Sequence, residues 1–200
     1  EAAAVVGASR VARQSTALNA IFEFQSSILT FFMERKFQQA QISSMFYKNM
    51  FRGYTQDLRV GKEKIMEIFG VTNYVPQISL FEPMATEARK DIADGMRSVN
   101  YLYDSGQLYS ALERLMETFV LGEYEPVMQT FPFEKKQRLL EVYKKTSTIK
   151  KLADAKDWGT LESIANDLGE IAADYPIAEI MSSVKAAQRA SNMCVLSAKQ

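Results

Sequence analysis

Apolar side chains recur at helical spacing from residue 15 to residue 69, a range that has no proline and only two glycines, Gly53 and Gly61. This pattern predicts one or two long helices. Within it, residues 20–51 are rich in phenylalanine and have neither proline nor glycine, so we expect them to form one unbroken helix. At about 100° per residue its apolar side chains cover an arc of roughly 200°, which several neighbouring helices would have to bury.

A break in the helical pattern follows at residues 70–83, where Gly70, Pro76 and Pro83 enclose β-branched residues. This composition predicts an ordered connection with a short extended piece, because proline and glycine interrupt helices. Helical spacing then returns and predicts helices over 84–104, 108–120, 132–157 and 157–174, and a last one that begins at Pro176.

The expected fold class is all-α, because no stretch alternates apolar and polar residues over a useful length. About seven helices are expected, with short connections that favour antiparallel neighbours. We divide the chain into a long N-terminal helical segment (1–70), a linker (71–83) and a region of helical hairpins (84–200). The long N-terminal helix is expected to pack against the antiparallel pairs as an irregular bundle or a short repeat array.

Three of the later helices have an apolar face that we expect to point inward. In the helix over 84–104 this face consists of Ile92, Met96, Val99 and Tyr103. In the helix over 132–157 it consists of Leu139, Tyr143, Thr146, Ile149 and Ala153. In the last helix it consists of Ile177, Ile180, Met181, Val184, Ala187, Ser191 and Cys194. The only cysteine is therefore expected to be a small core residue.

Two stretches, residues 106–119 and 156–176, carry parts of a common helical motif. In the first, Gly106 and Ala111 have the spacing of a turn glycine and a close-packed alanine. The motif resembles the second helix of a tetratricopeptide repeat, which runs Gly-x-aromatic-x-x-Ala and ends near a proline. The resemblance implies stacked antiparallel helix pairs with a concave surface for a peptide or protein partner.

The second stretch matches that family pattern through Trp158, at the aromatic position, and Pro176, at the terminal proline. It departs from the pattern at Lys156, which replaces the glycine, and at Leu161, which replaces the alanine. The two motifs are also 50 residues apart, whereas the period of the family is about 34 residues. An irregular helical bundle is therefore kept as the alternative to a repeat array.

The composition is that of a globular domain, with 200 residues of which 47% are hydrophobic and 24% charged. The 24 basic and 24 acidic residues balance, so no global field attracts nucleic acid, and we expect no nucleic-acid partner. Histidine is absent. This removes the commonest general base, the commonest metal ligand and the usual partner of a nucleophilic serine or cysteine.

No glycine-rich phosphate-binding loop is present, because the nine glycines are scattered. Carboxylates do occur at helical spacing, for example at Glu63 and Glu67, but these lie beside Lys62 and Lys64 and are typical of a solvated helix face. A di-iron carboxylate site would need histidine. The expectation is a protein with no catalytic residues, no metal site and no cofactor, although a site built from carboxylates alone stays open.

Charge is distributed in blocks of alternating sign. Residues 1–62 hold eight basic and four acidic side chains, residues 87–125 hold four and eight, and residues 134–156 hold eight and three. Such blocks fit docking between helices or to a complementary partner. The basic segment 134–156 is read as an exposed helix face, with contact to an anionic lipid or RNA surface as the alternative. It lacks the interleaved aromatic residues on which bases stack.

The aromatic N-terminal helix has three candidate uses: a core, a subunit interface or a membrane contact. A span over residues 17–33 is not expected, because polar residues interrupt it and a transmembrane helix needs about 20 mostly apolar residues. Burying one phenylalanine is worth roughly 1.5 to 3 kcal/mol, so a core is the main expectation. If part of the surface forms an interface, the candidates are Phe24, Phe31, Phe32, Phe46 and Phe51.

These observations favour a non-catalytic helical module that binds a protein partner or self-associates. The predicted partner-binding residues are aromatic side chains near turns: Tyr101, Tyr109, Tyr124 and Trp158. Two alternatives of other classes are a membrane-active helical protein, whose aromatic helix is released on contact with lipid, and a carrier of an apolar ligand. The sequence carries no sign of the cellular compartment.

Overall fold

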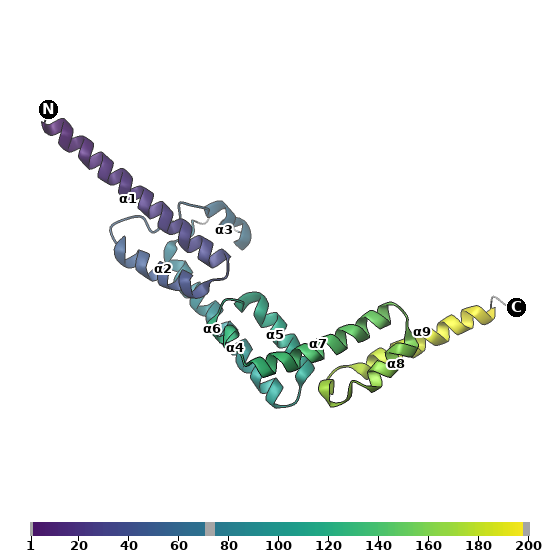
Figure 1. The fold of residues 1–200 in the computed structure, drawn as a ribbon. Helices are drawn as coiled ribbons and strands as arrows, with labels where there is room; N and C mark the ends of the chain where they lie inside the picture. The colour runs from purple at the N-terminus through teal and green to yellow at the C-terminus, as the bar shows by residue number, and fades with distance from the viewer. Residues whose placement is uncertain (1, 71–74, 198–200) are drawn as a thin grey trace. The chain divides into compact units, whose positions relative to one another are not determined.

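The computed structural model describes residues 2–70 and 75–197, and over these residues the fold is all-α, as predicted. About 80% of the chain is helical, and the described part contains nine α-helices and two short 3-10 helices (Figure 1). In order they are α1 (Ala2–Met33), α2 (Phe37–Met50), α3 (Lys62–Phe69), η1 (Ile78–Leu80), α4 (Phe81–Asp104), α5 (Leu108–Gly122), α6 (Pro126–Gln129), α7 (Phe133–Asp154), α8 (Trp158–Asn166), η2 (Gly169–Ala172) and α9 (Ile177–Ser197). Among the described residues, β pairing is limited to one isolated bridge between Asp57 and Gln77.

The chain divides into two compact units. The N-terminal unit comprises residues 1–93 with 121–129, and the C-terminal unit comprises residues 94–120 with 130–200. The predicted linker over 71–83 falls partly on residues 71–74, which lie outside the described residues. The described residues at its end form η1 and the start of α4. The predicted division at 70 and 84 stays a prediction.

The predicted unbroken helix over 20–51 is wrong. Helix α1 ends at Met33 and α2 begins at Phe37, with Arg35 between them in the left-handed conformation at φ 61°. The Lys36 N–H donates to the Phe31 carbonyl (2.8 Å) and the Arg35 N–H to the Phe32 carbonyl (3.0 Å), a pair of bonds known as a Schellman motif. The chain thus reverses into a hairpin although no glycine marks the turn.

The wide apolar arc seen in the sequence is explained by this hairpin, because two helices with separate inner faces were read as one. The Phe24 ring stacks on Phe46 with centroids 5.6 Å apart and meets Phe51 edge-on at 5.9 Å. Core side chains of this unit come from α1, α2, the following loop, α3, η1 and the start of α4: Ile21, Ile28, Leu29, Tyr47, Leu58, Ile65, Ile78 and Phe81. A second cluster packs Phe37 and Ala40 of α2 against α4.

Three helical hairpins end their first helix in the same way. After α4, Gly106 is left-handed at φ 77°, and its N–H donates to the Tyr103 carbonyl (3.0 Å) while the Gln107 N–H donates to the Leu102 carbonyl (2.9 Å). After α7, Lys156 takes this position at φ 58° with the same two bonds. Each turn has three residues between helices. The geometry is therefore set by the backbone and by packing, with glycine in only one of the three turns.

We expect Lys156→Gly to stabilise the protein by about 0.5 to 1 kcal/mol. The left-handed conformation costs a residue with a Cβ about 1 to 2 kcal/mol, and the greater freedom of glycine in the unfolded chain takes back part of that gain. Denaturant unfolding of the variant measures the change. Gly106→Ala is the matched control and should destabilise by about 1 kcal/mol. A Lys156→Gly variant that is less stable than the wild type would contradict the left-handed conformation of Lys156.

Helices α4 and α5 approach closely at glycines. A Cβ on Gly122 would lie 2.5 Å from Cγ2 of Ile92 in the N-terminal unit. A Cβ on Gly95 would lie 2.5 Å from Oγ1 of Thr118 in the C-terminal unit. Because neither distance leaves room for a methyl group, these glycines set the distance between the helices.

The predicted inward faces are confirmed in part. Ile92, Met96 and Val99 of α4 are buried, as are Leu139, Thr146 and Ile149 of α7. The prediction for Tyr143 is wrong: this side chain is 48% exposed, and Val142 is buried instead, because the inner position after Leu139 is three residues on and not four.

The last helix departs further from prediction. In α9 Val184 is buried, but beyond it all residues up to 195 are exposed except the half-buried Gln188. The prediction of a core position for Cys194 is therefore wrong, since this thiol is exposed. The predicted helix over 157–174 is also divided, because α8 ends at Asn166 and a 3-10 turn follows with Gly169 at φ 52°.

Candidate functional site

The four aromatic residues predicted to bind a partner lie in different surroundings. Tyr101 is 72% exposed near the end of α4, in the C-terminal unit. Tyr124 is 43% exposed in the N-terminal unit, where the Lys36 ammonium lies 5.7 Å from its ring centroid. Tyr109 and Trp158 are half-buried in the C-terminal unit. The four residues do not form one surface within either unit, and their role in binding stays a prediction.

Tyr109 takes part in internal packing. Its ring meets Tyr175 edge-on, with centroids 4.7 Å apart, and its hydroxyl donates to the Glu113 carboxylate at 2.7 Å. Burial raises the pKa of Tyr109 to about 12, and the hydrogen bond to Glu113 adds to the rise. The phenol is therefore neutral at physiological pH and holds α5 against the segment before α9.

The carboxylate of Asp174 caps the N-terminus of α5 from 64 residues away. It accepts hydrogen bonds from the backbone N–H groups of Tyr109 (2.9 Å) and Ser110 (2.7 Å), which no carbonyl inside the helix can satisfy. Burial is the largest single influence and raises the pKa of Asp174. The hydrogen bonds from Ser110 and Tyr109 together outweigh it, so the pKa is lowered from its ordinary value.

We expect Asp174→Asn to lower the free energy of unfolding by about 1 to 2 kcal/mol at pH 7, because an amide oxygen replaces two charged acceptors. The folded-state pKa lies below the unfolded one, so the ionised form stabilises the wild type above pH ~4. This contribution is lost as the pH falls through the folded-state pKa. Urea unfolding between pH 7 and pH 2 should show the variant and the wild type converging. The exposed Asp91→Asn serves as control, and a difference that persists at pH 2 would contradict the cap.

The five phenylalanines proposed for an interface are mostly part of the core. Phe24, Phe32 and Phe51 pack against the main cluster of the N-terminal unit, and Phe31 packs against the second. Only Phe46 among the five is counted as exposed, at 49%. Aromatic pairing in this hairpin is therefore largely internal, and Phe46 is the member that a partner can reach.

Phe46 belongs to an apolar surface on α2. Its neighbours at helical spacing are Ile42, Met45 and Met50, with exposed fractions of 58%, 45% and 60%. We call these four residues the α2 surface. The opposite side of the helix is buried through Phe37, Ala40, Ser44 and Tyr47. Of these four residues the sequence analysis named only Phe46 as an interface candidate, because the phase of α2 becomes clear only once its start at Phe37 is known.

A groove lies in the C-terminal unit where the end of α7, the start of α8 and the first turns of α9 meet. It is an open hollow of about 390 Å³, and its residues are Ala153, Asp154, Trp158, Glu179, Ile180, Ser183 and Val184. Figure 1 shows these three helices side by side. Asp157 caps α8 through a hydrogen bond from the Thr160 N–H (3.3 Å), which fixes the position of Trp158 one residue on. We call this the Trp158 groove.

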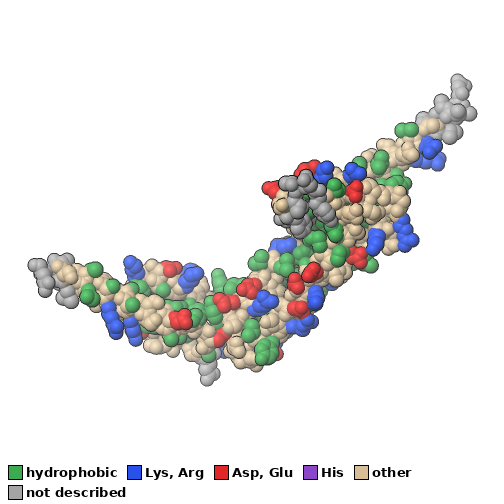
Figure 2. All heavy atoms as spheres, turned by 180° about the vertical axis from the view of Figure 1, so that it is seen from behind, with side chains coloured by type: hydrophobic (Ala, Val, Ile, Leu, Met, Phe, Trp, Pro, Cys, Tyr) green, Lys and Arg blue, Asp and Glu red, His purple; other side chains and the backbone are tan. Residues whose placement is uncertain are grey.

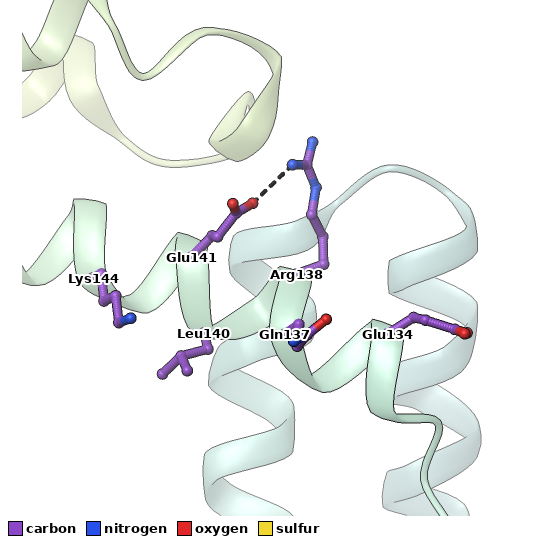
Figure 3. A pocket seen from close by; sticks show the side chains of 6 residues that line it. All are labelled: Glu134, Gln137, Arg138, Leu140, Glu141 and Lys144. Carbon is purple, nitrogen blue, oxygen red and sulfur yellow. Dashed lines mark hydrogen bonds and ion pairs between the residues drawn. The ribbon is translucent and has the colours of Figure 1, made fainter.

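A second hollow of about 430 Å³ lies along α7. Figure 3 shows its lining residues, with Arg138 and Glu141 extended toward each other and joined at 2.9 Å. All six lining residues come from this helix: Glu134, Gln137, Arg138, Leu140, Glu141 and Lys144. Two acidic and two basic side chains balance, so this part of the basic segment does not favour an anionic ligand. Lys135, nearby, is held by Asp104 at 3.0 Å and lies over the Tyr103 ring.

No group of three or more acidic or cysteine side chains suited to a metal ion occurs in residues 2–70 and 75–197. In the same residues no helix is long and apolar enough to span a bilayer. A scan against protein-family models finds no match, and searches of curated proteins and of solved structures find no significant match. The candidate sites are therefore the α2 surface and the Trp158 groove, argued from their own chemistry.

Proposed function

We propose that this chain is a non-catalytic helical interaction module that binds a protein through the α2 surface. The observation that supports the proposal is a row of four apolar side chains, each 45% to 60% exposed, on one side of a helix whose other side is buried. Methionine, isoleucine and phenylalanine together suit an adaptable apolar contact, and a contiguous apolar patch is typical of interaction sites. Figure 2 shows hydrophobic side chains between charged ones of both signs on one face of the molecule.

The occupant of the α2 surface is either a second copy of this chain or another protein. An apolar helix laid along α2 would contact Ile42, Phe46 and Met50, which lie on neighbouring turns. Burying such side chains is worth roughly 1.5 to 3 kcal/mol each when they start fully exposed, and less here because about half of Phe46 is already covered. A contact of this strength needs further residues around it, which favours a module that works with a sizeable partner.

Size-exclusion chromatography with light scattering tests the proposal, followed by capture of partners from a native extract. The double variant Ile42→Ser, Met50→Ser removes the outer part of the α2 surface without touching the core. The matched control, Val11→Ser with Leu18→Ser, makes the same chemical change on exposed positions of α1. We expect the first variant, and not the control, to lose self-association or partner capture. A wild type that stays monomeric and captures nothing would overturn the proposal.

The likeness to tetratricopeptide repeats is proposed only for the hairpin turns. In its favour, Gly106 and Lys156 occupy equivalent left-handed positions, and Ala111 and Leu161 are both buried one turn into the next helix. Arg35 and Ala40 repeat this arrangement in the N-terminal unit. The unequal spacing of the turns along the chain argues for a series of irregular hairpins instead of a repeat of fixed period.

The two alternative functions have less support. A membrane-active protein would have to release Phe24, Phe32 and Phe51 from the core against which they pack. Leakage from liposomes over a range of pH and lipid charge would favour it. A carrier of an apolar ligand needs an apolar cavity, whereas both hollows described above are bordered by charged side chains. Native mass spectrometry with extra mass on the chain would favour a carrier.

A further inference from the structure

The Trp158 groove combines an apolar floor with acidic edges. Trp158 from α8 and Ile180 and Val184 from α9 supply the apolar side chains, and Val184 is only 5% exposed. Asp154, the last residue of α7, and Glu179, in the first turn of α9, supply two carboxylates. This open hollow of about 390 Å³ has room for a few side chains of a partner.

The charged side chains that line this groove are both acidic. No lysine or arginine is among its lining residues, and neither Asp154 nor Glu179 forms an ion pair with any residue that the structure describes. The C-terminal end of α7, which carries the negative end of the helix dipole, meets the groove at Asp154. Both carboxylates thus present negative charge beside an aromatic face that also attracts cations.

We propose that the Trp158 groove binds a basic segment of a partner protein, with a lysine or arginine side chain between the two carboxylates and a neighbouring aliphatic side chain on Trp158 and Ile180. Charge complementarity selects this occupant. An acidic segment would meet two like charges, and a purely apolar one would leave Asp154 and Glu179 desolvated without partners. The groove lies in the C-terminal unit and the α2 surface in the N-terminal unit, so this inference does not depend on the proposed function.

The only tryptophan of the chain lies in the groove, so its fluorescence reports binding there directly. The probes are three blocked pentapeptides with alanine at both ends and leucine on either side of a central lysine, glutamine or glutamate. At low ionic strength we expect the lysine peptide to bind about tenfold more tightly than the glutamate peptide. Addition of 0.5 M salt should reduce the preference to about twofold, because exposed charges are screened.

The double variant Asp154→Asn, Glu179→Gln should abolish the preference for lysine while leaving binding of the glutamine peptide unchanged. Both side chains are exposed, so folding should be retained. The matched control, Glu87→Gln with Asp91→Asn, removes the same charge from exposed positions of the N-terminal unit and should keep the preference. Equal affinity of the wild type for the three peptides, or equal loss in both double variants, would overturn the inference.

Discussion

Gln25→Leu should lower the free energy of unfolding by about 3 to 5 kcal/mol. Gln25 is completely buried in α1, and its side-chain oxygen accepts from the Arg59 N–H at 2.8 Å. Its amide nitrogen donates to the Tyr47 hydroxyl and to the Asp57 carbonyl, each at 3.0 Å. Leucine fills nearly the same volume, so the loss comes from three polar groups left without this partner, at about 1 to 3 kcal/mol each. Urea unfolding measures it.

The same network fixes the loop between α2 and α3. The Tyr47 hydroxyl also donates to the Thr55 carbonyl at 2.9 Å, so Gln25 and Tyr47 together hold both sides of this loop. In Gln25→Leu the Arg59 amide should therefore exchange with solvent faster, which hydrogen exchange followed by NMR or mass spectrometry detects. Gln39→Leu, on the exposed side of α2, is the control and should change stability by less than about 0.5 kcal/mol. Equal effects of the two changes would contradict the role of the network.

The sequence was sufficient for the fold class and for helices whose ends carry glycine or proline. The predicted end of α4 is correct because Gly106 allows the left-handed turn that follows. Its start was placed at 84 and lies at Phe81, because Pro83 fits within the first turn of a helix, where its missing N–H costs nothing. Periodicity also identified the buried side of α4 through Ile92, Met96 and Val99.

The turn at Arg35 could not be found in the same way, because an arginine in the left-handed conformation leaves no mark in the sequence. Two antiparallel helices gain contacts that one straight helix lacks, such as the stacking of Phe24 on Phe46. These contacts outweigh the backbone strain of a left-handed arginine. Lys156 is a second residue with a Cβ that adopts the left-handed conformation in a turn between helices. Local propensity is a weak guide wherever tertiary packing contributes more than the roughly 1 to 2 kcal/mol at stake in the backbone.

The candidate sites depended on contacts between residues distant in sequence. Trp158 was singled out from the sequence, and Ile180 was placed on the inner face of the last helix. Nothing in the sequence brings these two residues together with Glu179 of α9 in one groove. To predict the α2 surface, one must know which residues of α2 face outward. The prediction of one unbroken helix over 20–51 concealed this. Buried polar partners such as Gln25 were equally hidden, because glutamine on a helix is usually exposed.

Arg89→Met should destabilise the N-terminal unit by about 2 to 3 kcal/mol. The Arg89 guanidinium on α4 donates to the Glu125 carboxylate at 3.0 Å and to the Gln41 side-chain oxygen at 2.7 Å. The Glu125 side chain is only 5% exposed, so removal of its partner leaves a carboxylate largely out of water. The expected loss is below the 3 to 5 kcal/mol of a fully buried pair, because about a third of Arg89 is exposed.

A double-mutant cycle separates the buried charge from the lost packing. Glu125→Gln in the Arg89→Met background removes the uncompensated charge, so the double variant should be more stable than Arg89→Met alone. Arg114→Met provides the surface control, since its pair with Glu117 (3.2 Å) is exposed on both sides and should contribute less than about 0.5 kcal/mol. If Glu125→Gln fails to recover stability, the cost of Arg89→Met lies in lost packing against α2 and not in the buried carboxylate. Gln41 of α2 also donates a hydrogen bond to the Thr86 hydroxyl on α4, at 2.9 Å.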